Sequence, residues 1–251
     1  GAAFARQFAK QGYDLILTGR RKERIASLAE TLSKSHNIEA EVVIAELSDD
    51  RQLDLLLDRV RTVTGLEVLV NNAGFANENP FHEEPVTTHE MMLKVHNLAP
   101  VKLCHAVLPN MVARRKGAII NVSSMAAFLP LPGEAMYSGT KAFLKSFTES
   151  IHLELRGTGV RAQVLCPGMT RTDFHERMGY DPKAFYRDSG MLKAMTAEEV
   201  VQVSLRDLER GKVLCVPGRS RKMLRLLMKF LPQSAIYKIV SAPSKTKGQA
   251  G

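Results

Sequence analysis

The sequence predicts an α/β fold in which a doubly wound parallel sheet carries helices on both of its faces. Short runs of β-branched and other apolar residues alternate with amphipathic stretches, and no repeat or long linker interrupts this alternation. Such alternation is typical of βαβ crossovers, which place successive strands in parallel. The chain has 251 residues, of which 45% are hydrophobic, and therefore matches a single globular domain of this class.

The individual elements follow from local patterns along the chain. Strands are expected where apolar runs are short, at residues 14–18, 40–46, 68–71, 118–122, 161–166 and 213–216. Helices are expected where apolar residues recur at helical spacing, at about residues 2–11, 22–34, 50–63, 87–114, 134–156 and 196–210. Thr196 is a suitable N-cap for the last helix, since Glu198 and Glu199 place carboxylates in its first turn. Residues 169–195 show neither period, and their Met, Phe and Tyr side chains fit either a lid over a ligand or an ordinary packed excursion.

Charge divides the chain into two parts. From Lys212 onward there are nine basic residues and no acidic one, which accounts for the whole net charge of +9 and leaves residues 1–211 neutral. We therefore expect a domain at residues 1–218 and a basic extension at residues 219–251. The three cysteines are far apart in apolar surroundings, so reduced core residues are favoured over a metal site. Because there is neither a run of about 20 apolar residues nor a signal-like N-terminal segment, a cytoplasmic protein is expected.

A tyrosine and a lysine stand four residues apart in one of the expected helices. Tyr137 and Lys141, in the segment YSGTK, therefore lie on one helix face, one turn apart. A nearby cation favours phenolate and moves the tyrosine pKa from about 10 towards the working range of a proton donor. This spacing alone occurs by chance in many helices, so its interpretation depends on the neighbouring segments.

Further polar residues accompany this pair. Ser124 ends an apolar strand thirteen residues before Tyr137, and open α/β sheets bind ligands at the carboxyl ends of their strands. The strand VLVNNAG runs into amide side chains and a glycine at residues 71–74, and Asn97 lies inside an otherwise apolar helix. Each of these residues alone is consistent with a turn or a satisfied core polar group, whereas together they indicate a catalytic site.

These segments, in this order and spacing, resemble the short-chain dehydrogenase/reductase family, whose fold is Rossmann-like. The resemblance covers the chain from Gly1 to about Gly218. The matching pieces are NNAG at 71–74, Asn97 in HNLAP, Ser123-Ser124, YSGTK at 137–141 and PGMTRT at 167–172.

The resemblance implies roles for individual residues. Ser124 would hydrogen-bond the substrate carbonyl, Tyr137 would give it a proton, and Lys141 would hold the nicotinamide ribose and lower the tyrosine pKa. Asn97 would position a water molecule that links Lys141 to solvent. Cofactor contacts are implied at Gly1, Leu47, Asn71, Ala73, Gly74, Tyr137, Lys141, Pro167, Gly168, Thr170 and Thr172, with Thr172 at the carboxamide.

The end of the strand at residues 14–18 indicates which cofactor is bound. Gly19 is followed by Arg20 and Arg21, where NAD-preferring dinucleotide folds usually carry an acidic residue for the ribose 2′-hydroxyl. A guanidinium group can hold a phosphate bidentately. We therefore expect NADP(H) in preference to NAD(H), with Arg20 as the main contact and Arg21 as the second; the alternative is two solvated arginines at the start of a helix.

The chain departs from the family's pattern at two places. The family begins with a strand and a TGxxxGxG turn, whereas this chain begins at what resembles the last glycine of that turn, so we interpret it as N-terminally truncated. Because the first strand is central in this topology, its loss should leave a slot beside the strands at residues 14–18 and 68–71. The second departure is Glu46, which stands where the family usually has Asp, although Leu47 can still supply a backbone contact near the adenine.

The basic extension contains an amphipathic pattern at residues 219–231. A helical projection places Arg221, Lys222, Arg225 and Lys229 on one side and apolar residues on the other. We favour packing of this helix on its own domain or on a partner subunit, because amphipathic helices are common. Peripheral contact with an anionic membrane through residues 219–231 is the alternative, and binding of nucleic acid is not expected.

The resemblance implies an NADP(H)-dependent oxidoreductase that interconverts a ketone or aldehyde and an alcohol. Apolar residues at Phe75, Phe128, Leu129, Leu131 and in residues 169–195 favour an apolar ketoacyl, steroid or general carbonyl substrate. The family suggests a homodimer or homotetramer formed through the long helices that carry Asn97 and Tyr137. A non-catalytic nucleotide-binding scaffold or sensor is the alternative, but it predicts decay of the four catalytic residues, all of which are present.

Overall fold

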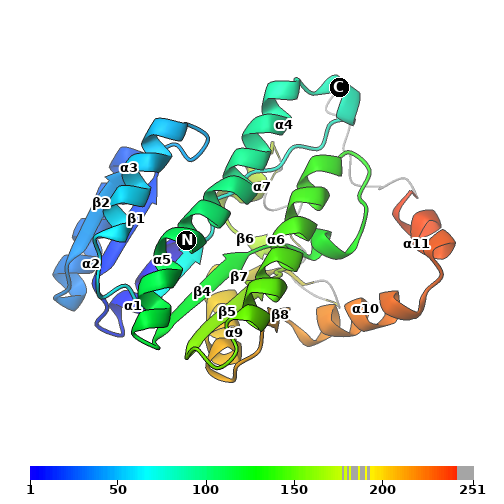
Figure 1. Cartoon of the computed structure of the whole chain (residues 1–251). Helices are drawn as coiled ribbons and strands as arrows, with labels where there is room; N and C mark the ends of the chain where they lie inside the picture. The colour runs from blue at the N-terminus through cyan, green and yellow to red at the C-terminus, as the bar shows by residue number, and fades with distance from the viewer. Residues whose placement is uncertain (177, 180, 182–185, 187–189, 191–192, 242–251) are drawn as a thin grey trace.

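The computed structural model contains the predicted alternation of strands and helices (Figure 1). It describes residues 1–251 except 177, 180, 182–185, 187–189, 191–192 and 242–251. The strands are β1 (Leu15–Gly19), β2 (Ala40–Ile44), β3 (Val68–Asn71), β4 (Gly117–Val122), β5 (Val160–Leu165), β6 (Thr170–Arg171), β7 (Met195–Thr196) and β8 (Leu214–Cys215). The α-helices are α1 (Ala2–Ala9), α2 (Lys22–His36), α3 (Asp50–Arg61), α4 (Val86–Leu93), α5 (Ala99–Ala113), α6 (Ala135–Glu154), α7 (Asp173–Glu176), α9 (Ala197–Glu209), α10 (Arg219–Phe230) and α11 (Gln233–Val240).

All strand pairs are parallel, as βαβ connections require. The strands form a pair β1-β2, a four-stranded sheet in the order β3-β4-β5-β8 and a short pair β6-β7. β1 and β3 thus belong to different sheets, and residues of both strands line one cavity. This arrangement matches the slot expected beside residues 14–18 and 68–71.

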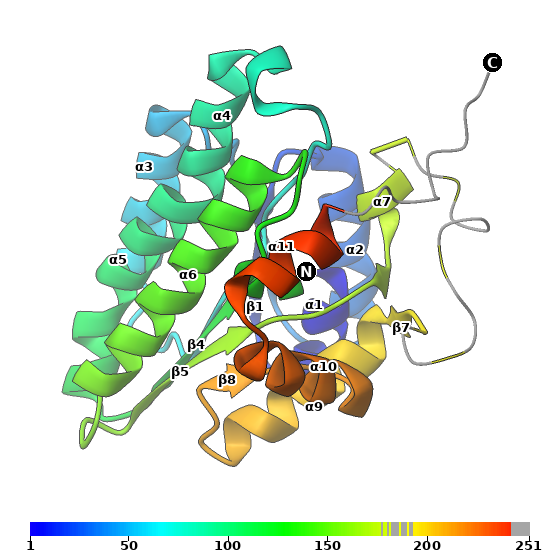
Figure 2. The same cartoon turned by 90° about the vertical axis from the view of Figure 1, so that its right-hand side faces the viewer.

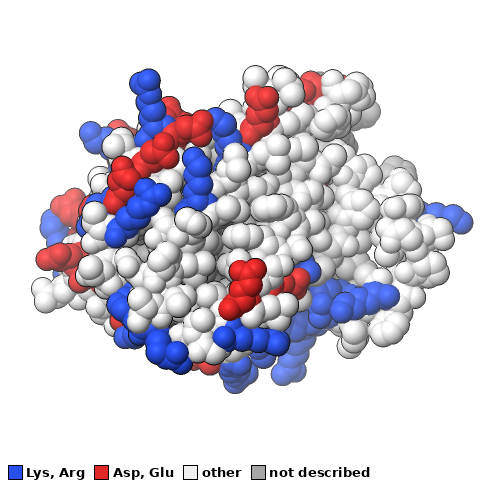
Figure 3. All heavy atoms as spheres, in the orientation of Figure 1, with Lys and Arg blue, Asp and Glu red and all other residues white. Residues whose placement is uncertain are grey.

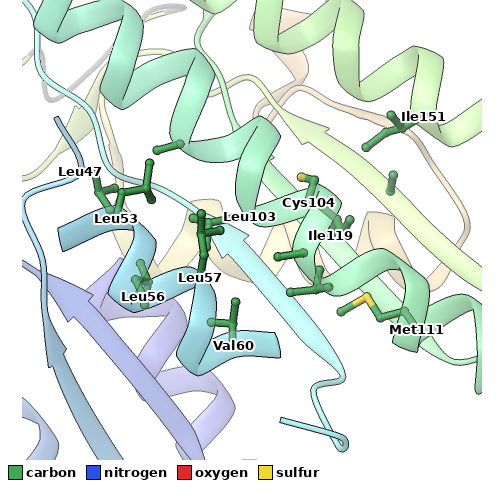
Figure 4. Packing of buried hydrophobic residues seen from close by; sticks show 14 of the residues in the cluster. Leu47, Leu53, Leu56, Leu57, Val60, Leu103, Cys104, Met111, Ile119 and Ile151 are labelled. Atoms are coloured by element: carbon green, nitrogen blue, oxygen red, sulfur yellow. The ribbon is translucent and has the colours of Figure 1, made fainter. Parts of the chain in front are cut away.

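Helices cover both faces of the strands (Figures 1 and 2). On one face, α3 presents Leu53, Leu56, Leu57 and Val60 at helical spacing towards α5 and β4 (Figure 4). On the other face, residues of α1 and α9 pack against Ala118 and Ile120 of β4. Since Ile119 points to the first face, β4 alternates between two covered sides and is buried along most of its length.

The long helix expected at residues 87–114 is interrupted by one π-helical turn. α4 ends at Leu93, the π turn spans Lys94–Leu98, and α5 follows. Within this turn the Ala99 N–H bonds the Lys94 carbonyl, five residues earlier. Such wide turns are frequent at functional sites, and this one contains Asn97.

The C-terminal part confirms one expectation and adds detail to another. Thr196 caps α9 in a reciprocal capping box, in which each of Thr196 and Glu199 bonds the other's backbone N–H. The basic side of the expected helix is divided in the structure, since Arg221 is buried and Arg225 is half-buried whereas Lys222 and Lys229 are exposed. Both arginines lie on the side of α10 that packs against the domain. Among the described residues, no helix is both long and apolar enough to cross a membrane.

Candidate active site

Two elements bring Ser124, Tyr137 and Lys141 together. Ser124 follows β4 in an extended conformation, and its Oγ accepts the Ala126 N–H at 3.1 Å, which starts the 3₁₀ turn Met125–Phe128. Tyr137 lies in the first turn of α6, and its hydroxyl is hydrogen-bonded to that of Ser124. Lys141 lies one turn later, with Nζ 5.7 Å from the centroid of the Tyr137 ring. The predicted strand end, with Ser124, and the predicted helix face, with Tyr137 and Lys141, therefore lie next to each other.

Burial determines the protonation of this group. It raises the pKa of Tyr137 to about 12, although the hydrogen bond with Ser124 acts in the opposite direction. Burial also lowers the pKa of Lys141 to about 8. The expected lowering of the tyrosine pKa by Lys141 is not present, because Lys141 Nζ donates to the Val122 carbonyl at 3.0 Å and burial of the phenol dominates. At neutral pH Tyr137 therefore holds its proton.

The π turn positions two side chains beside α6. Asn97 Nδ2 donates to the Thr140 carbonyl at 3.0 Å, while its buried Oδ1 has no hydrogen-bond partner among the described residues. His96 contacts Thr140 Oγ1 through Nδ1 at 2.9 Å, and its Nε2 accepts the Phe75 N–H at 3.0 Å. The ring of His96 also packs edge-on against Tyr137, with 5.8 Å between centroids. His96 is not among the site residues predicted from the sequence. The only indication of its role there is that a histidine lies inside an otherwise apolar helix.

The NNAG segment continues β3 towards the same place. Asn71 Nδ2 donates to Asn121 Oδ1 at 2.8 Å, and Asn121 Nδ2 donates to the hydroxyl of Thr148, so amides connect β3, β4 and α6. Gly74 lies close to both His96 and Lys141. A Cβ atom at Gly74 would lie 3.1 Å from His96 Nε2 and 3.4 Å from Lys141 Nζ. Glycine at this position therefore leaves the space between its backbone and the side chains of His96 and Lys141 unfilled.

The two arginines after β1 lie at the rim of the site. The Arg20 side chain is 57% exposed, and its Nη1 lies 3.2 Å from Glu46 Oε2. Arg21 Nη1 lies 3.7 Å from Asp173 Oδ2, at the start of α7. Each guanidinium group thus contacts a carboxylate, and both side chains remain accessible.

The segment at residues 167–172 is anchored by an arginine of the C-terminal helix α10. Arg221 of α10 donates from Nη2 to the Lys193 carbonyl at 2.6 Å and to the Met169 carbonyl at 3.4 Å. Gly168 has no room for a side chain, because a Cβ atom there would collide with the guanidinium group of Arg221. The sequence places Arg221 on the basic side of the expected helix but gives no sign of this anchor, because Met169 and Lys193 lie in distant segments.

Most of the predicted site residues line one cavity of about 2060 Å³. Asn97 is the exception, because its side chain is buried against the Thr140 carbonyl of α6. The residues that line the cavity are Gly1, Arg20, Arg21, Leu47, Asn71, Ala73, Gly74, Ser124, Tyr137, Lys141, Pro167, Gly168, Thr170 and Thr172. The expected 169–195 segment contributes Phe174, whose ring centroid lies 6.1 Å from that of Tyr137. Its residues 180, 185 and 191 lie outside the described part of the chain.

The donor set fits a dinucleotide better than a metal ion. Accessible arginines lie at one side of the cavity, while an open glycine backbone and a tyrosine–lysine pair lie deeper inside it. In the described ranges no group of three or more His, Cys, Asp or Glu side chains is arranged to hold a metal ion. The arrangement can therefore hold a phosphate-bearing cofactor and donate a proton beside it.

Comparison with known proteins decides the family. The family model described as short chain dehydrogenase matches residues 1–182. The chain belongs to the short-chain dehydrogenase/reductase family. Sulfoacetaldehyde reductase 2 of Chromohalobacter salexigens is 36% identical over 208 residues, which cover 80% of this chain and 82% of that relative. Very-long-chain 3-oxoacyl-CoA reductase of Mus musculus is 34% identical over 179 residues, or 68% of this chain and 56% of that protein.

A solved structure supports the fold and the cofactor of this short-chain dehydrogenase/reductase. The short-chain dehydrogenase from Sphingobium yanoikuyae in complex with NADPH superposes with a TM-score of 0.83 at 27% identity, covering 100% of this chain and 94% of that one. The predictions of a Rossmann-like fold, of an oxidoreductase and of NADP(H) are thereby confirmed. The chain is an NADP(H)-dependent oxidoreductase.

Proposed function

We propose that this enzyme reduces the carbonyl group of an apolar ketone or aldehyde, with Tyr137 as the proton donor. The observation that carries the proposal is the meeting of Ser124, Tyr137 and Lys141 in one cavity. A phenol whose pKa is raised to about 12 by burial retains its proton at neutral pH, which suits donation to a developing alkoxide. NADPH, when bound, supplies the hydride.

The chain's own residues orient the carbonyl and replace the proton. The Ser124 hydroxyl would donate to the substrate oxygen, and the Tyr137 hydroxyl would protonate that oxygen as negative charge develops on it. Lys141 would hold the nicotinamide ribose and stay cationic below its pKa of about 8. The unpartnered Oδ1 of Asn97 suits a water molecule that leads from Lys141 towards solvent.

The cofactor would be held by residues that line the cavity, from Tyr137 and Lys141 to the arginines at its rim. Arg20 would be the main contact and Arg21 the second contact of the 2′-phosphate, since both side chains are accessible where β1 ends. Leu47 would contact the adenine, and Thr172 the carboxamide. The remaining proposed contacts are Gly1, Asn71, Ala73, Gly74, Pro167, Gly168 and Thr170.

Apolar walls favour an apolar substrate. The ring of Phe174 faces Tyr137, and Phe75 and Leu131 also line the cavity. A long-chain 3-oxoacyl group, as in the name of the mouse relative, has this character, whereas the sulfoacetaldehyde of the bacterial relative does not. We therefore propose a ketoacyl, steroid or bulky aromatic ketone as the substrate class.

The enzyme's assembly and location complete the proposal. The long helices α5 and α6 carry exposed apolar side chains, including Val112, Phe143 and Leu153, which supports a homodimer or homotetramer formed through these helices. Cys104, Cys166 and Cys215 are all buried free thiols, which supports a reducing, cytoplasmic location.

A substrate series tests the proposal. NADPH oxidation by the full-length protein would be followed with matched ketones, from small polar ones to bulky apolar ones, for the wild type and for Ser124→Ala. We expect kcat/KM to rise with apolar bulk and to fall about a hundredfold or more in Ser124→Ala, as for the loss of an oxyanion donor. Ser35→Ala, an exposed serine of α2 that does not line the cavity, is the matched control. A preference for small charged carbonyls would refute the apolar substrate class.

A further inference from the structure

The C-terminal helices expose apolar side chains, and those of α10 recur at helical spacing. On α10, Met223, Leu226, Leu227 and Phe230 recur at intervals of three and four residues, and Phe230 is 79% exposed. α11 adds Tyr237 and Ile239, of which Ile239 is 64% exposed. We call these six side chains the outer face of α10–α11. A surface helix of a globular protein normally turns its apolar side inward, so this orientation is the reverse of the usual one.

Polar anchors hold α10 in this orientation. Arg221 is buried and donates to the carbonyls of Lys193 and Met169. One turn later, the Arg225 guanidinium lies 5.8 Å from the centroid of the Phe128 ring. Because these two arginines occupy the domain side of the helix, Met223, Leu226 and Leu227 are left on its exposed side. Rotating α10 to bury its apolar side would remove both arginine contacts.

The outer face is bordered by positive charge. Arg219, Lys229 and Lys238 are exposed on the same two helices, and the sequence has no acidic residue after Lys212. In the space-filling view, basic side chains lie along α10 and at the outer edge of α11, with uncharged surface between them and no acidic side chain in view there (Figure 3). A two-fold contact between copies would place this positive surface against itself, which disfavours a second copy as the partner.

We propose that the outer face of α10–α11 docks the protein on a lipid bilayer that contains anionic lipids. Apolar side chains of an interfacial helix enter the boundary between head groups and acyl chains, while bordering cations contact anionic head groups. The outer face meets both requirements with side chains that are already exposed. This proposal concerns binding alone and does not depend on the proposed reaction.

Vesicle flotation tests the proposal with the full-length protein. Phosphatidylcholine vesicles would be compared with vesicles that also contain phosphatidylglycerol, for the wild type, for Leu227→Gln/Phe230→Gln and for Lys229→Gln/Lys238→Gln. Leu55→Gln, an exposed apolar side chain on α3, is the control for the first variant. Lys10→Gln/Lys34→Gln, two exposed cations on the opposite part of the chain, is the control for the second. All of the substituted side chains are exposed, so the fold should tolerate the changes.

We expect the wild type and both controls to float with the anionic vesicles. The lysine variant should bind roughly 25-fold more weakly, since each cation contributes about fivefold near an anionic surface. The leucine–phenylalanine variant should lose binding to both kinds of vesicle. The proposal would be overturned if the wild type did not bind anionic vesicles. It would equally be overturned if the variants bound like their controls, or if light scattering showed that Leu227→Gln/Phe230→Gln converts an oligomer into monomers.

Discussion

His96 is buried, neutral and bonded through both ring nitrogens, so replacing it with leucine should destabilise the fold in a pH-dependent way. Because Nε2 accepts the Phe75 N–H, the ring proton is assigned to Nδ1, which donates to Thr140 Oγ1. The Thr140 hydroxyl in turn donates to the Tyr137 carbonyl at 2.9 Å. Burial, with a further contribution from Lys141, lowers the pKa of His96 to about 2.

The size of the effect follows from these contacts. At pH 7 the leucine variant leaves the Phe75 N–H without its acceptor, which costs about 1–3 kcal/mol in the free energy of unfolding. For a chain of this size, 1 kcal/mol corresponds to a shift of about 2–4 °C in the thermal midpoint. We therefore expect His96→Leu to unfold roughly 2–12 °C below the wild type at neutral pH.

The pH dependence has a definite sign. The folded-state pKa of His96 is lowered below its unfolded value of about 6.5, so the stability associated with its neutral form is present above that pH and is lost as the pH falls. The loss reaches about 1.4 kcal/mol per pH unit in the wild type and is missing from the variant. Between about pH 6.5 and 4.5 the difference in unfolding free energy should therefore shrink by about 2–3 kcal/mol.

Thermal midpoints measured at several pH values would check this prediction. His105→Leu is the matched control, because His105 is exposed on α5. The difference between the wild type and His96→Leu should narrow steadily below pH 6.5, whereas His105→Leu should follow the wild type. A difference that stays constant from neutral to acidic pH would refute the description of His96 as a buried neutral bridge.

Two arginines carry the remaining predictions. Arg20→Ala should raise the KM for NADPH roughly tenfold to a hundredfold, which is the effect of losing a charge-assisted hydrogen bond, and should change the KM for NADH little. Arg61→Ala is the control. An equal rise in KM for both cofactors would contradict the assignment of Arg20 to the 2′-phosphate. Arg221→Met should lower the thermal midpoint and raise the KM for NADPH, because the carbonyls of Lys193 and Met169 lose this donor, whereas Arg219→Met should do neither. Identical behaviour of the two methionine variants would show that Arg221 does not anchor residues 167–172.

The fold and the centre of the site were predictable because they rest on local periodicity. Apolar runs of strand length placed β1 to β5 within a few residues, and a spacing of four placed Tyr137 and Lys141 on one face of α6. Ser124 could be located because a polar residue at the end of a buried strand lies at the ligand-binding edge of such a sheet. These features depend on neighbours in the sequence, and tertiary packing did not change them.

The features that sequence reasoning missed depend on contacts between distant segments. The π turn at Lys94–Leu98 shifts one backbone hydrogen bond, which leaves no compositional signal. His96 acquires its role from Phe75 and Thr140, which come from two other elements. A helical projection of α10 groups Arg221 and Arg225 with Lys222 and Lys229, but in the structure only the two lysines are exposed. The two carbonyls that hold Arg221 lie 52 and 28 residues away, so its burial could not be predicted from the local pattern.

The steady-state kinetics of Tyr137→Phe test the proposed catalytic role most directly. With the best ketone of the series, and with NADPH binding measured separately by fluorescence, this variant should bind the cofactor like the wild type. Its kcat/KM should fall about a hundredfold to ten-thousandfold, the value of a positioned general acid, while Tyr237→Phe should leave it unchanged. Retention of wild-type turnover by Tyr137→Phe would contradict the assignment of Tyr137 as the proton donor.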